Sequence, residues 1–439
     1  MQARAASLEN RAGAGGARRD ALALLGWAAL IAVACGWGEL LNNQGTTILL
    51  GAPPLSGRFN PGLQPEALIT LAVAAAIVVA APRLAASLGW RGLLLATFAG
   101  AWAWAGALDL LDGGYWLTVP VLKPDEFLRD VPLVGSPGSF LSHFTQHIDI
   151  YVNHVQTHPP GTLLTLWGLD QIGLGGAMPA ALLMVSGGAA AMPAALIAAR
   201  EVAGEERARA AAPYLVLAPA AIWIATSADA LYAGVVGWGV ALIVLATGRE
   251  GRRSDALALG GGLLLGLALM FSYGLVLAWA IPAVVAVARR RLRPLAIAAL
   301  GPLAIVAAFA AAGFWWLDGY ASARNSYYGG VASNRPYLFF GVSNLAAFAV
   351  ALGPAVCVGL TRLRDSGAWL LVGGGLAAVA LADLSGMSKG EVERIWLPFA
   401  PFVMLAACAL PAERRATRAW LAGAALFAAF VEMLVRTAW

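Results

Sequence analysis

Long apolar stretches recur along nearly the whole chain, separated by short segments that hold most of the charged residues. Each stretch has about the 20 residues that an α-helix needs to cross a hydrocarbon layer of ~30 Å. A membrane β-barrel would instead show short segments of alternating polarity, and none appears here. The pattern predicts an all-α fold, a polytopic transmembrane helical bundle with about 13 spans. The expected spans are residues 22–41, 65–82, 92–112, 178–199, 211–227, 230–248, 255–272, 274–289, 295–316, 340–361, 368–384, 395–411 and 418–436.

The basic residues give this bundle a direction. With residues 1–20 in the cytoplasm, 21 of the 29 lysines and arginines fall inside and 8 fall outside, as the positive-inside rule expects. Residues 160–174 are also apolar, but a span there would reverse everything that follows. We therefore expect a helix in the external interface at this point, within a long external loop of residues 113–177.

Composition agrees with this topology and narrows the function. The chain of 439 residues is 60% hydrophobic and 12% charged, about half the charge of an ordinary soluble domain. Its basic pI of about 9.3 follows from the cytoplasmic arginines, so we expect no nucleic-acid partner. The three cysteines lie far apart in apolar runs, which argues against a disulfide framework or a cysteine metal site.

Two acids close the predicted helix 92–112. Asp109 and Asp112 are three residues apart, hence on one helix face, and the helix dipole disfavours a carboxylate at this end. A catalytic base or a metal ligand therefore competes with a simple solvated helix end, and the first interpretation is favoured. The glycines at 113 and 114 allow close approach to Asp112, which we place ahead of Asp109.

All four histidines fall within 16 residues of the long external loop. On one continuous helix, positions 143, 147, 151, 154 and 158 would form a single stripe that ends at Pro159-Pro160. Such a stripe suits a metal site, the polar wall of a substrate cavity, or an ordinary interfacial helix, and we favour the cavity wall. The lining candidates are His147, Asp149, Tyr151 and His154.

Further charged candidates lie near the end of the chain. Lys389 and Arg394 could clamp a phosphate, or could form internal salt bridges with Glu391 and Glu393. Arg335, in the aromatic segment 314–340, is another phosphate candidate. We also place Glu391 in the substrate cavity. Elsewhere, Glu39, Glu66 and Asp229 are interpreted as solvated helix ends, and the glycine-rich segments 260–266 and 373–375 as helix-packing surfaces.

With these residues in hand, the chain resembles the GT-C superfamily of integral membrane glycosyltransferases. In that family a helix ending in acid leads into a first long external loop, and a Pro-Pro motif closes it. Here His158-Pro159-Pro160-Gly161 looks like the His-Pro-Pro of protein O-mannosyltransferases, and residues 389–399 (KGEVERIWLPF) look like the late external loop of actinobacterial members. Two helices precede the acidic loop where the family usually has one, and the paired acid is written Asp-x-x-Asp.

The resemblance implies a division of the chain and an activity. Residues 1–20 would be a cytoplasmic tail, 21–91 a two-helix addition, 92–411 the catalytic module, and 412–439 a last transmembrane helix. The activity would be inverting transfer of a mannose- or arabinose-type sugar from a polyprenyl-phosphate donor. The acceptor would be a cell-envelope glycan, lipid or protein at the external face of the cell membrane.

The same resemblance assigns roles to the candidate residues. Asp112 or Asp109 would be the base, and which of the two stays open. The donor phosphate would be held by Arg394, Lys389, Arg335 and His158. Some relatives need a divalent cation such as Mg²⁺ or Mn²⁺ and others need none, so the resemblance fixes no cofactor.

Two other functions compete with a glycosyltransferase. A transporter or lipid flippase usually places its binding groups at the bilayer midplane, often with internal repeats, whereas these charged residues gather at one face. A membrane acyltransferase suits a histidine-rich loop, but the chain has no evident serine or cysteine nucleophile constellation.

Overall fold

The computed structural model describes residues 2–62, 64–112, 117–225, 227–364 and 367–437, and for residues 2–15 and 112 it describes the backbone alone. The expected all-α fold is confirmed, since 77% of the chain is helical with almost no strand. The long and medium helices are α1 (Gln2–Asn43), α2 (Ala67–Ser87), α3 (Trp90–Asp109), α7 (Gly161–Gln171), α8 (Ala177–Ala203), α9 (Glu205–Val216), α10 (Ala228–Thr247), α11 (Gly251–Leu269), α12 (Ala280–Ala288), α14 (Leu300–Ala311), α15 (Trp316–Gly329), α16 (Tyr337–Arg362), α17 (Ala368–Leu384) and α20 (Arg414–Leu434).

Shorter elements connect these helices. The short α-helices are α4 (Thr118–Val121), α5 (Pro137–His143), α6 (Asn153–Gln156), α13 (Leu292–Ala298), α18 (Val392–Ile395) and α19 (Ala400–Met404). The 3₁₀ helices are η1 (Leu110–Asp112), η2 (Phe127–Leu133), η3 (Ile148–Ile150), η4 (Pro219–Trp223), η5 (Tyr273–Trp279), η6 (Val331–Ser333) and η7 (Leu405–Ala409). The strands β1 (Gly57–Phe59) and β2 (Val435–Thr437) pair antiparallel.

Eight helices within the described chain are long and apolar enough to cross a membrane. They are 16–43, 67–87, 90–109, 177–203, 228–247, 292–311, 337–362 and 414–434. Shorter apolar helices cover 273–288, 368–384 and 400–409. Each of the thirteen ranges expected from sequence overlaps helical structure, which makes the chain a multi-pass membrane protein, while the number of spans stays a prediction.

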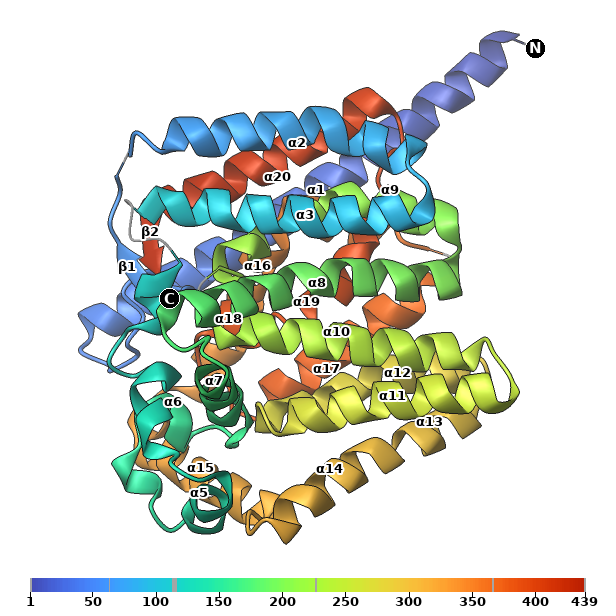
Figure 1. The fold of residues 1–439 in the computed structure, drawn as a ribbon. Helices are drawn as coiled ribbons and strands as arrows, with labels where there is room; N and C mark the ends of the chain where they lie inside the picture. The colour runs from blue at the N-terminus through green and yellow to red at the C-terminus, as the bar shows by residue number, and fades with distance from the viewer. Residues whose placement is uncertain (1, 63, 113–116, 226, 365–366, 438–439) are drawn as a thin grey trace.

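Helix α7 is separate from its neighbour α8. It has 11 residues, so it is about 16 Å long, too short to cross a hydrocarbon layer. It packs mainly against η2, and its first turn bonds to the long helices, through Thr162 and Tyr232 of α10. Figure 1 shows α7 beside α6 at the lower left, at the end of the bundle where α5 and α15 also lie.

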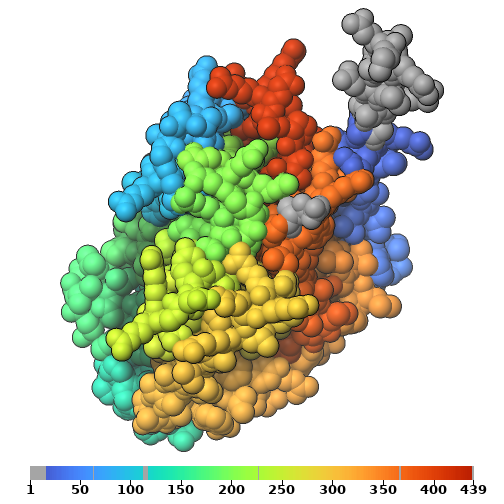
Figure 2. Space-filling view, turned by 90° about the vertical axis from the view of Figure 1, so that its right-hand side faces the viewer, coloured from blue at the N-terminus to red at the C-terminus, as the bar shows by residue number. Residues whose placement is uncertain are grey.

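The long helices form one bundle that includes the first and the last helix, α1 and α20. In Figure 1, α2, α3, α8, α10 and α11 run side by side, and α10 packs between α8 and α11. Helix α1 packs on α16, and α2 packs on both α3 and α20. Figure 2 shows this last contact on the surface, where blue and red segments meet at the top. The predicted two-helix addition and last helix therefore share one core with the predicted catalytic module.

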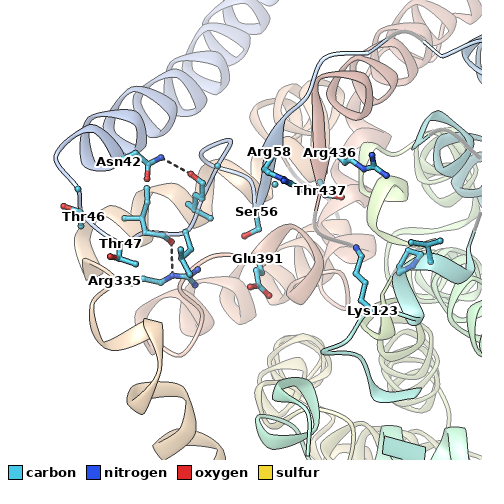
Figure 3. A pocket seen from close by; sticks show the side chains of 18 of the residues that line it. Asn42, Thr46, Thr47, Ser56, Arg58, Lys123, Arg335, Glu391, Arg436 and Thr437 are labelled. Carbon is cyan, nitrogen blue, oxygen red and sulfur yellow. Dashed lines mark hydrogen bonds between the residues drawn. The ribbon is translucent and has the colours of Figure 1, made fainter. Parts of the chain in front are cut away.

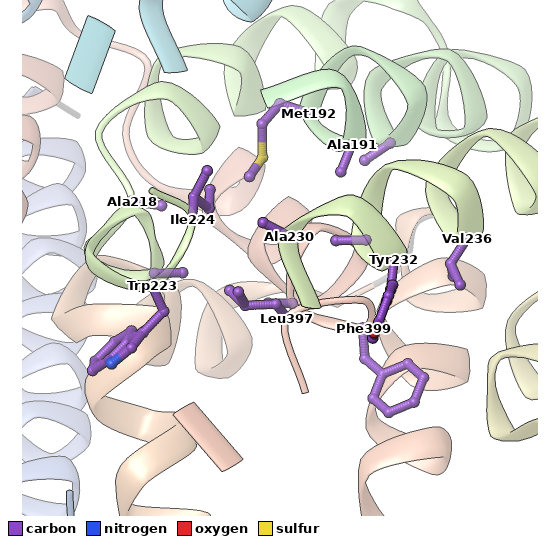
Figure 4. Close-up of a cluster of buried hydrophobic side chains, with 14 of the residues drawn as sticks. Ala191, Met192, Ala218, Trp223, Ile224, Ala230, Tyr232, Val236, Leu397 and Phe399 are labelled. Atoms are coloured by element: carbon purple, nitrogen blue, oxygen red, sulfur yellow. The ribbon is translucent and has the colours of Figure 1, made fainter. Parts of the chain in front are cut away.

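Small residues let the helices approach closely, as they commonly do in membrane bundles. A Cβ on Gly261 of α11 would lie 2.6 Å from the carbonyl oxygen of Gly239 in α10, and one on Gly374 of α17 would lie 2.7 Å from the Cα of Ile281. The prediction that segments 260–266 and 373–375 are packing surfaces is confirmed. Figure 4 shows part of the apolar core, in which Trp223 and Tyr232 are buried.

Candidate functional site

A cavity of about 1110 Å³ opens at the end of the bundle that carries β1 and β2. Its wall comes from segments far apart in sequence: the end of α1 and the following loop to β1, the end of α3, the loop around Lys123, and β2 (Figure 3). The polar and charged lining residues are Asn42, Thr46, Thr47, Ser56, Arg58, Asp109, Lys123, Arg335, Glu391, Arg436 and Thr437. Three of the site residues expected from sequence are thus brought together: Asp109, Arg335 and Glu391.

Asp109 is the last residue of α3 and is 8% exposed. Its Oδ2 accepts a hydrogen bond of 2.9 Å from the backbone N–H of Leu117. This bond offsets the unfavourable helix dipole that a carboxylate meets at this end. The structure therefore presents a held carboxylate at the cavity wall. Asp112 ends η1, and its side chain lies outside the described residues.

Arg335 and Lys389 hold two loops together. The Nε of Arg335 donates to the Ile48 carbonyl at 3.0 Å, and one of its terminal nitrogens donates to the Lys389 carbonyl. The Nζ of Lys389 donates to the carbonyls of Ala332 and Arg335 at 2.8 and 3.0 Å. Arg335 still lines the cavity, whereas Lys389 is not among its lining residues. Lys389 therefore supports the backbone behind the cavity wall.

Glu391 reaches the cavity from a tight turn. Its backbone is left-handed (φ 62°, ψ 13°), which is uncommon for any residue but glycine. Its Oε2 accepts from Arg394 at 2.7 Å, one helical turn later. Because strained backbone persists only where surrounding contacts enforce it, this ion pair fixes the carboxylate of Glu391 at the cavity.

Arg394 lies at the centre of a buried charge network. One terminal nitrogen donates to Asp229 Oδ2 at 2.6 Å, and the other contacts Glu391 and, at 3.3 Å, the Nε2 of His154. The Nδ1 of His154 lies 3.2 Å from Glu126 Oε1. The interpretation of Asp229 as a solvated helix end is wrong, because it is 4% exposed and paired with Arg394.

This network distinguishes between the two interpretations of Arg394, a phosphate clamp and an internal salt bridge. Arg394 is 6% exposed and its guanidinium contacts two carboxylates, so the structure places it in internal salt bridges instead of on the cavity wall. Burial opposes ionisation of Glu126, but the hydrogen bond and charge of His154 lower its pKa overall. The network thus pairs the guanidinium of Arg394 with two carboxylates inside the protein.

His158 lies next to this network and not at the cavity. Its Nδ1 contacts the His154 carbonyl at 2.8 Å, which places the ring proton on that nitrogen. Burial, followed by the charge of His154, lowers the pKa of His158 to about 4. The ring is therefore neutral at ordinary pH and supplies no positive charge for a phosphate.

The single histidine stripe expected over residues 143–158 is wrong. The segment consists of α5, η3 and α6, and Tyr151 and Val152 between the last two are extended. The carboxylate of Asp130 takes the Val152 N–H at 2.7 Å, which competes with helix bonding. His147 and Asp149 are exposed, and Tyr151 packs on Phe144. None of these lines the cavity.

Glu393 fastens the cavity wall from behind. It is fully buried, and its Oε1 accepts a 2.8 Å bond from the N–H of Ser56, a lining residue. Among the described residues, Oε2 has no hydrogen-bond partner. Burial raises the pKa of Glu393 from 4.5 to about 7. The folded protein therefore favours the protonated carboxyl.

Because of Glu393, we expect the free energy of unfolding to fall as the pH rises. The favourable contribution of the protonated side chain is complete below the unfolded pKa of 4.5 and is lost as pH rises through about 7, a change of about 3 kcal/mol. Thermal unfolding of the purified protein should show this slope, and Glu393→Gln should flatten it. The exposed Glu413→Gln is the control. An unchanged slope in Glu393→Gln would remove Glu393 as its cause.

Sequence reasoning missed several residues that build this end of the molecule. Arg58 and Arg436 face each other on β1 and β2, and Glu126 and Asp229 complete the buried network. A signal was present for the arginines, because they belong to the few basic residues on the predicted external side. No local pattern announces the pairing of Asp229 with Arg394, 165 residues away.

Few side chains in the described structure could bind a divalent cation. Among the residues that the structure covers, no three histidine, cysteine, aspartate or glutamate side chains gather as a metal site. Mg²⁺, however, is often held by one or two carboxylates together with substrate phosphate oxygens. Asp109 and Glu391 are the described carboxylates of the cavity that would contact such an ion, which would neutralise a leaving phosphate.

Comparison with known proteins gives a structural likeness only. No family model and no curated protein matches the chain. A crystal structure of ArnT from Cupriavidus metallidurans in the apo state is 18% identical with a TM-score of 0.47, covering 74% of this chain and 59% of that one. The oligosaccharyltransferase of Archaeoglobus fulgidus, in complex with Zn and sulfate, is 16% identical with a TM-score of 0.38, covering 64% and 45%.

The chain thus spans less than two thirds of the length of either solved protein. Both neighbours are GT-C fold members. With identities and TM-scores this low, neither assigns an activity, a substrate or a partner to this chain.

Proposed function

We propose that this chain is a membrane glycosyltransferase of the GT-C type, which moves a mannose- or arabinose-type sugar from a polyprenyl-phosphate donor to a hydroxyl of a cell-envelope glycan, lipid or protein. One observation carries the proposal: Asp109 shares a cavity of about 1110 Å³ with Arg58, Lys123, Arg335 and Arg436 at one end of an apolar helix bundle. A base and a cluster of cations are the two groups that this transfer needs.

The chemistry follows from those groups. Asp109 takes the proton of the acceptor hydroxyl as its oxygen attacks the anomeric carbon, a role suited to a positioned carboxylate. The bond between that carbon and the phosphate oxygen breaks on the opposite face, so the configuration inverts. Negative charge then builds on the leaving polyprenyl phosphate, and nearby cations stabilise it. Asp112 remains the alternative base.

The lipid part of the donor suits the position of the cavity. A polyprenyl chain partitions into a bilayer, while its phosphate stays at the surface, so the reacting bond lies at the end of the spans. We place the cavity on the external side, as the distribution of basic residues favours. The charged cavity residues lie at that end and not at the midplane, where a transporter would bind its cargo.

A panel of radiolabelled polyprenyl-phosphate sugars, mannose and arabinose included, tests the proposal with membranes that contain the full chain. One donor should yield labelled acceptor and an equal amount of free polyprenyl phosphate. Absence of transfer from every donor, with the protein shown to be folded, would overturn the proposal. Uptake of the intact donor into liposomes under the same conditions would favour a flippase instead.

A further inference from the structure

Strands β1 and β2 place two arginines directly opposite each other. The ladder pairs Arg58 with Arg436, flanked by the pairs Gly57–Thr437 and Phe59–Val435. Directly opposite residues of an antiparallel pair project from the same face with their Cβ atoms about 5 Å apart. Both arginines line the cavity, and Figure 3 shows them together on the wall above Lys123, across from Arg335.

Among the described residues, no carboxylate forms a salt bridge with this arginine pair. Like charges directly opposite on neighbouring strands are destabilising. Within the described part of the chain, neither Arg58 nor Arg436 forms a salt bridge, although ten other salt bridges are present there. The cavity acids are engaged elsewhere, because Asp109 accepts from Leu117 and Glu391 accepts from Arg394.

The wider charge distribution makes this cluster more unusual. Only 8 of the 29 basic residues lie on the predicted external side. Four of those eight, Arg58, Lys123, Arg335 and Arg436, line the same cavity. A face that is otherwise poor in cations therefore concentrates them around one space, which favours an anionic ligand there.

We propose that Arg58 and Arg436, with Lys123 beside them, form a binding site for a phosphate group. Guanidinium groups match phosphate oxygens in planar, two-point hydrogen bonds, and an anion between the two arginines offsets their repulsion. Binding of a phosphate at this site does not require that the protein catalyse sugar transfer. Its assignment to the phosphate of a lipid donor rests on the proposed function.

This site differs from the phosphate clamp expected from sequence. Arg394 is enclosed by carboxylates, Lys389 bonds backbone carbonyls, and His158 is neutral. The arginine pair comes instead from the loop after α1 and from the strand after α20, both outside the predicted catalytic module. The predicted two-helix addition and the predicted last transmembrane segment thus supply the charge.

Binding to the purified full chain in detergent tests the site with three probes. Inorganic phosphate reports a site for the free anion, geranylgeranyl phosphate reports a site for a lipid headgroup, and geranylgeraniol is the same lipid without charge. Whichever phosphate probe binds the wild type should bind about tenfold more weakly to Arg58→Gln and to Arg436→Gln. It should bind about a hundredfold more weakly to the double variant. Lysine at either position should restore part of the affinity. Arg83→Gln, an exposed arginine on α2 away from the cavity, is the matched control.

The outcomes separate cleanly. Binding of both phosphate probes assigns the free anion, and binding of geranylgeranyl phosphate alone assigns a lipid headgroup. Wild-type affinity in the double variant overturns the site, as does an equal loss for geranylgeraniol, which would mean that the arginines only shape the cavity. Failure of both phosphate probes to bind the wild type also overturns it. Absence of sugar transfer would overturn the proposed function and leave the binding result unaffected.

Discussion

Asp109→Asn is expected to lower the rate of sugar transfer by about a thousandfold, within the range that a positioned general base contributes. Asparagine keeps the size of the side chain and an oxygen that can accept the 2.9 Å bond from Leu117. The fold and the binding of a polyprenyl phosphate should therefore persist, while proton removal from the acceptor is lost. Initial rates with saturating donor measure the effect.

The matched control for this experiment is Asp125→Asn. Asp125 is an exposed acid of the same loop that does not line the cavity, so its rate should equal that of the wild type. If Asp109→Asn keeps the wild-type rate, Asp109 is not the base, and the same measurement on Asp112→Asn decides whether the other aspartate takes that role.

Arg394→Leu is expected to destabilise the protein by about 3–5 kcal/mol, because it leaves Asp229 and Glu391 without the charge that they pair with. The Arg394 and Asp229 side chains are only 7% and 5% exposed, so water cannot compensate for the loss. Unfolding of the detergent-solubilised protein measures this effect. Arg394→Leu combined with Asp229→Asn should recover part of the stability, since one buried charge is then removed.

Arg293→Leu provides the control for a surface pair. Arg293 contacts Asp255 at 2.8 Å but is 75% exposed, and ion pairs that exposed contribute little to stability. Its loss should therefore change stability little. The structural role of Arg394 would be wrong if Arg394→Leu unfolds like the wild type and instead fails to bind geranylgeranyl phosphate.

Much of the fold could be predicted because lipid imposes strict rules on sequence. Apolar runs of span length and the bias of arginines are properties of single segments, so all thirteen expected ranges overlap helices. The glycines at 261 and 374 were predictable for the same reason, because close helix packing requires small residues.

The site was less accessible to sequence reasoning because its contacts are long-range. The histidine stripe assumed a continuous helix, but a side chain elsewhere, Asp130, takes the backbone N–H of Val152. Asp229 looked like a helix end until the fold placed Arg394 beside it. Arg58 and Arg436 lie 378 positions apart and pair only in the folded chain. Local patterns predict elements well, whereas charge pairing depends on tertiary structure.

The pairing of β1 with β2 also determines when the cavity wall is completed during synthesis of the protein. A chain is synthesised from its N-terminus, so the loop that carries Arg58 is complete long before residues 435–437 leave the ribosome. The cavity wall can close only after α20 has inserted and delivered Arg436. A nascent or interrupted chain therefore has an incomplete cavity wall, and the proposed phosphate site forms only late in biogenesis, after the preceding helices have inserted.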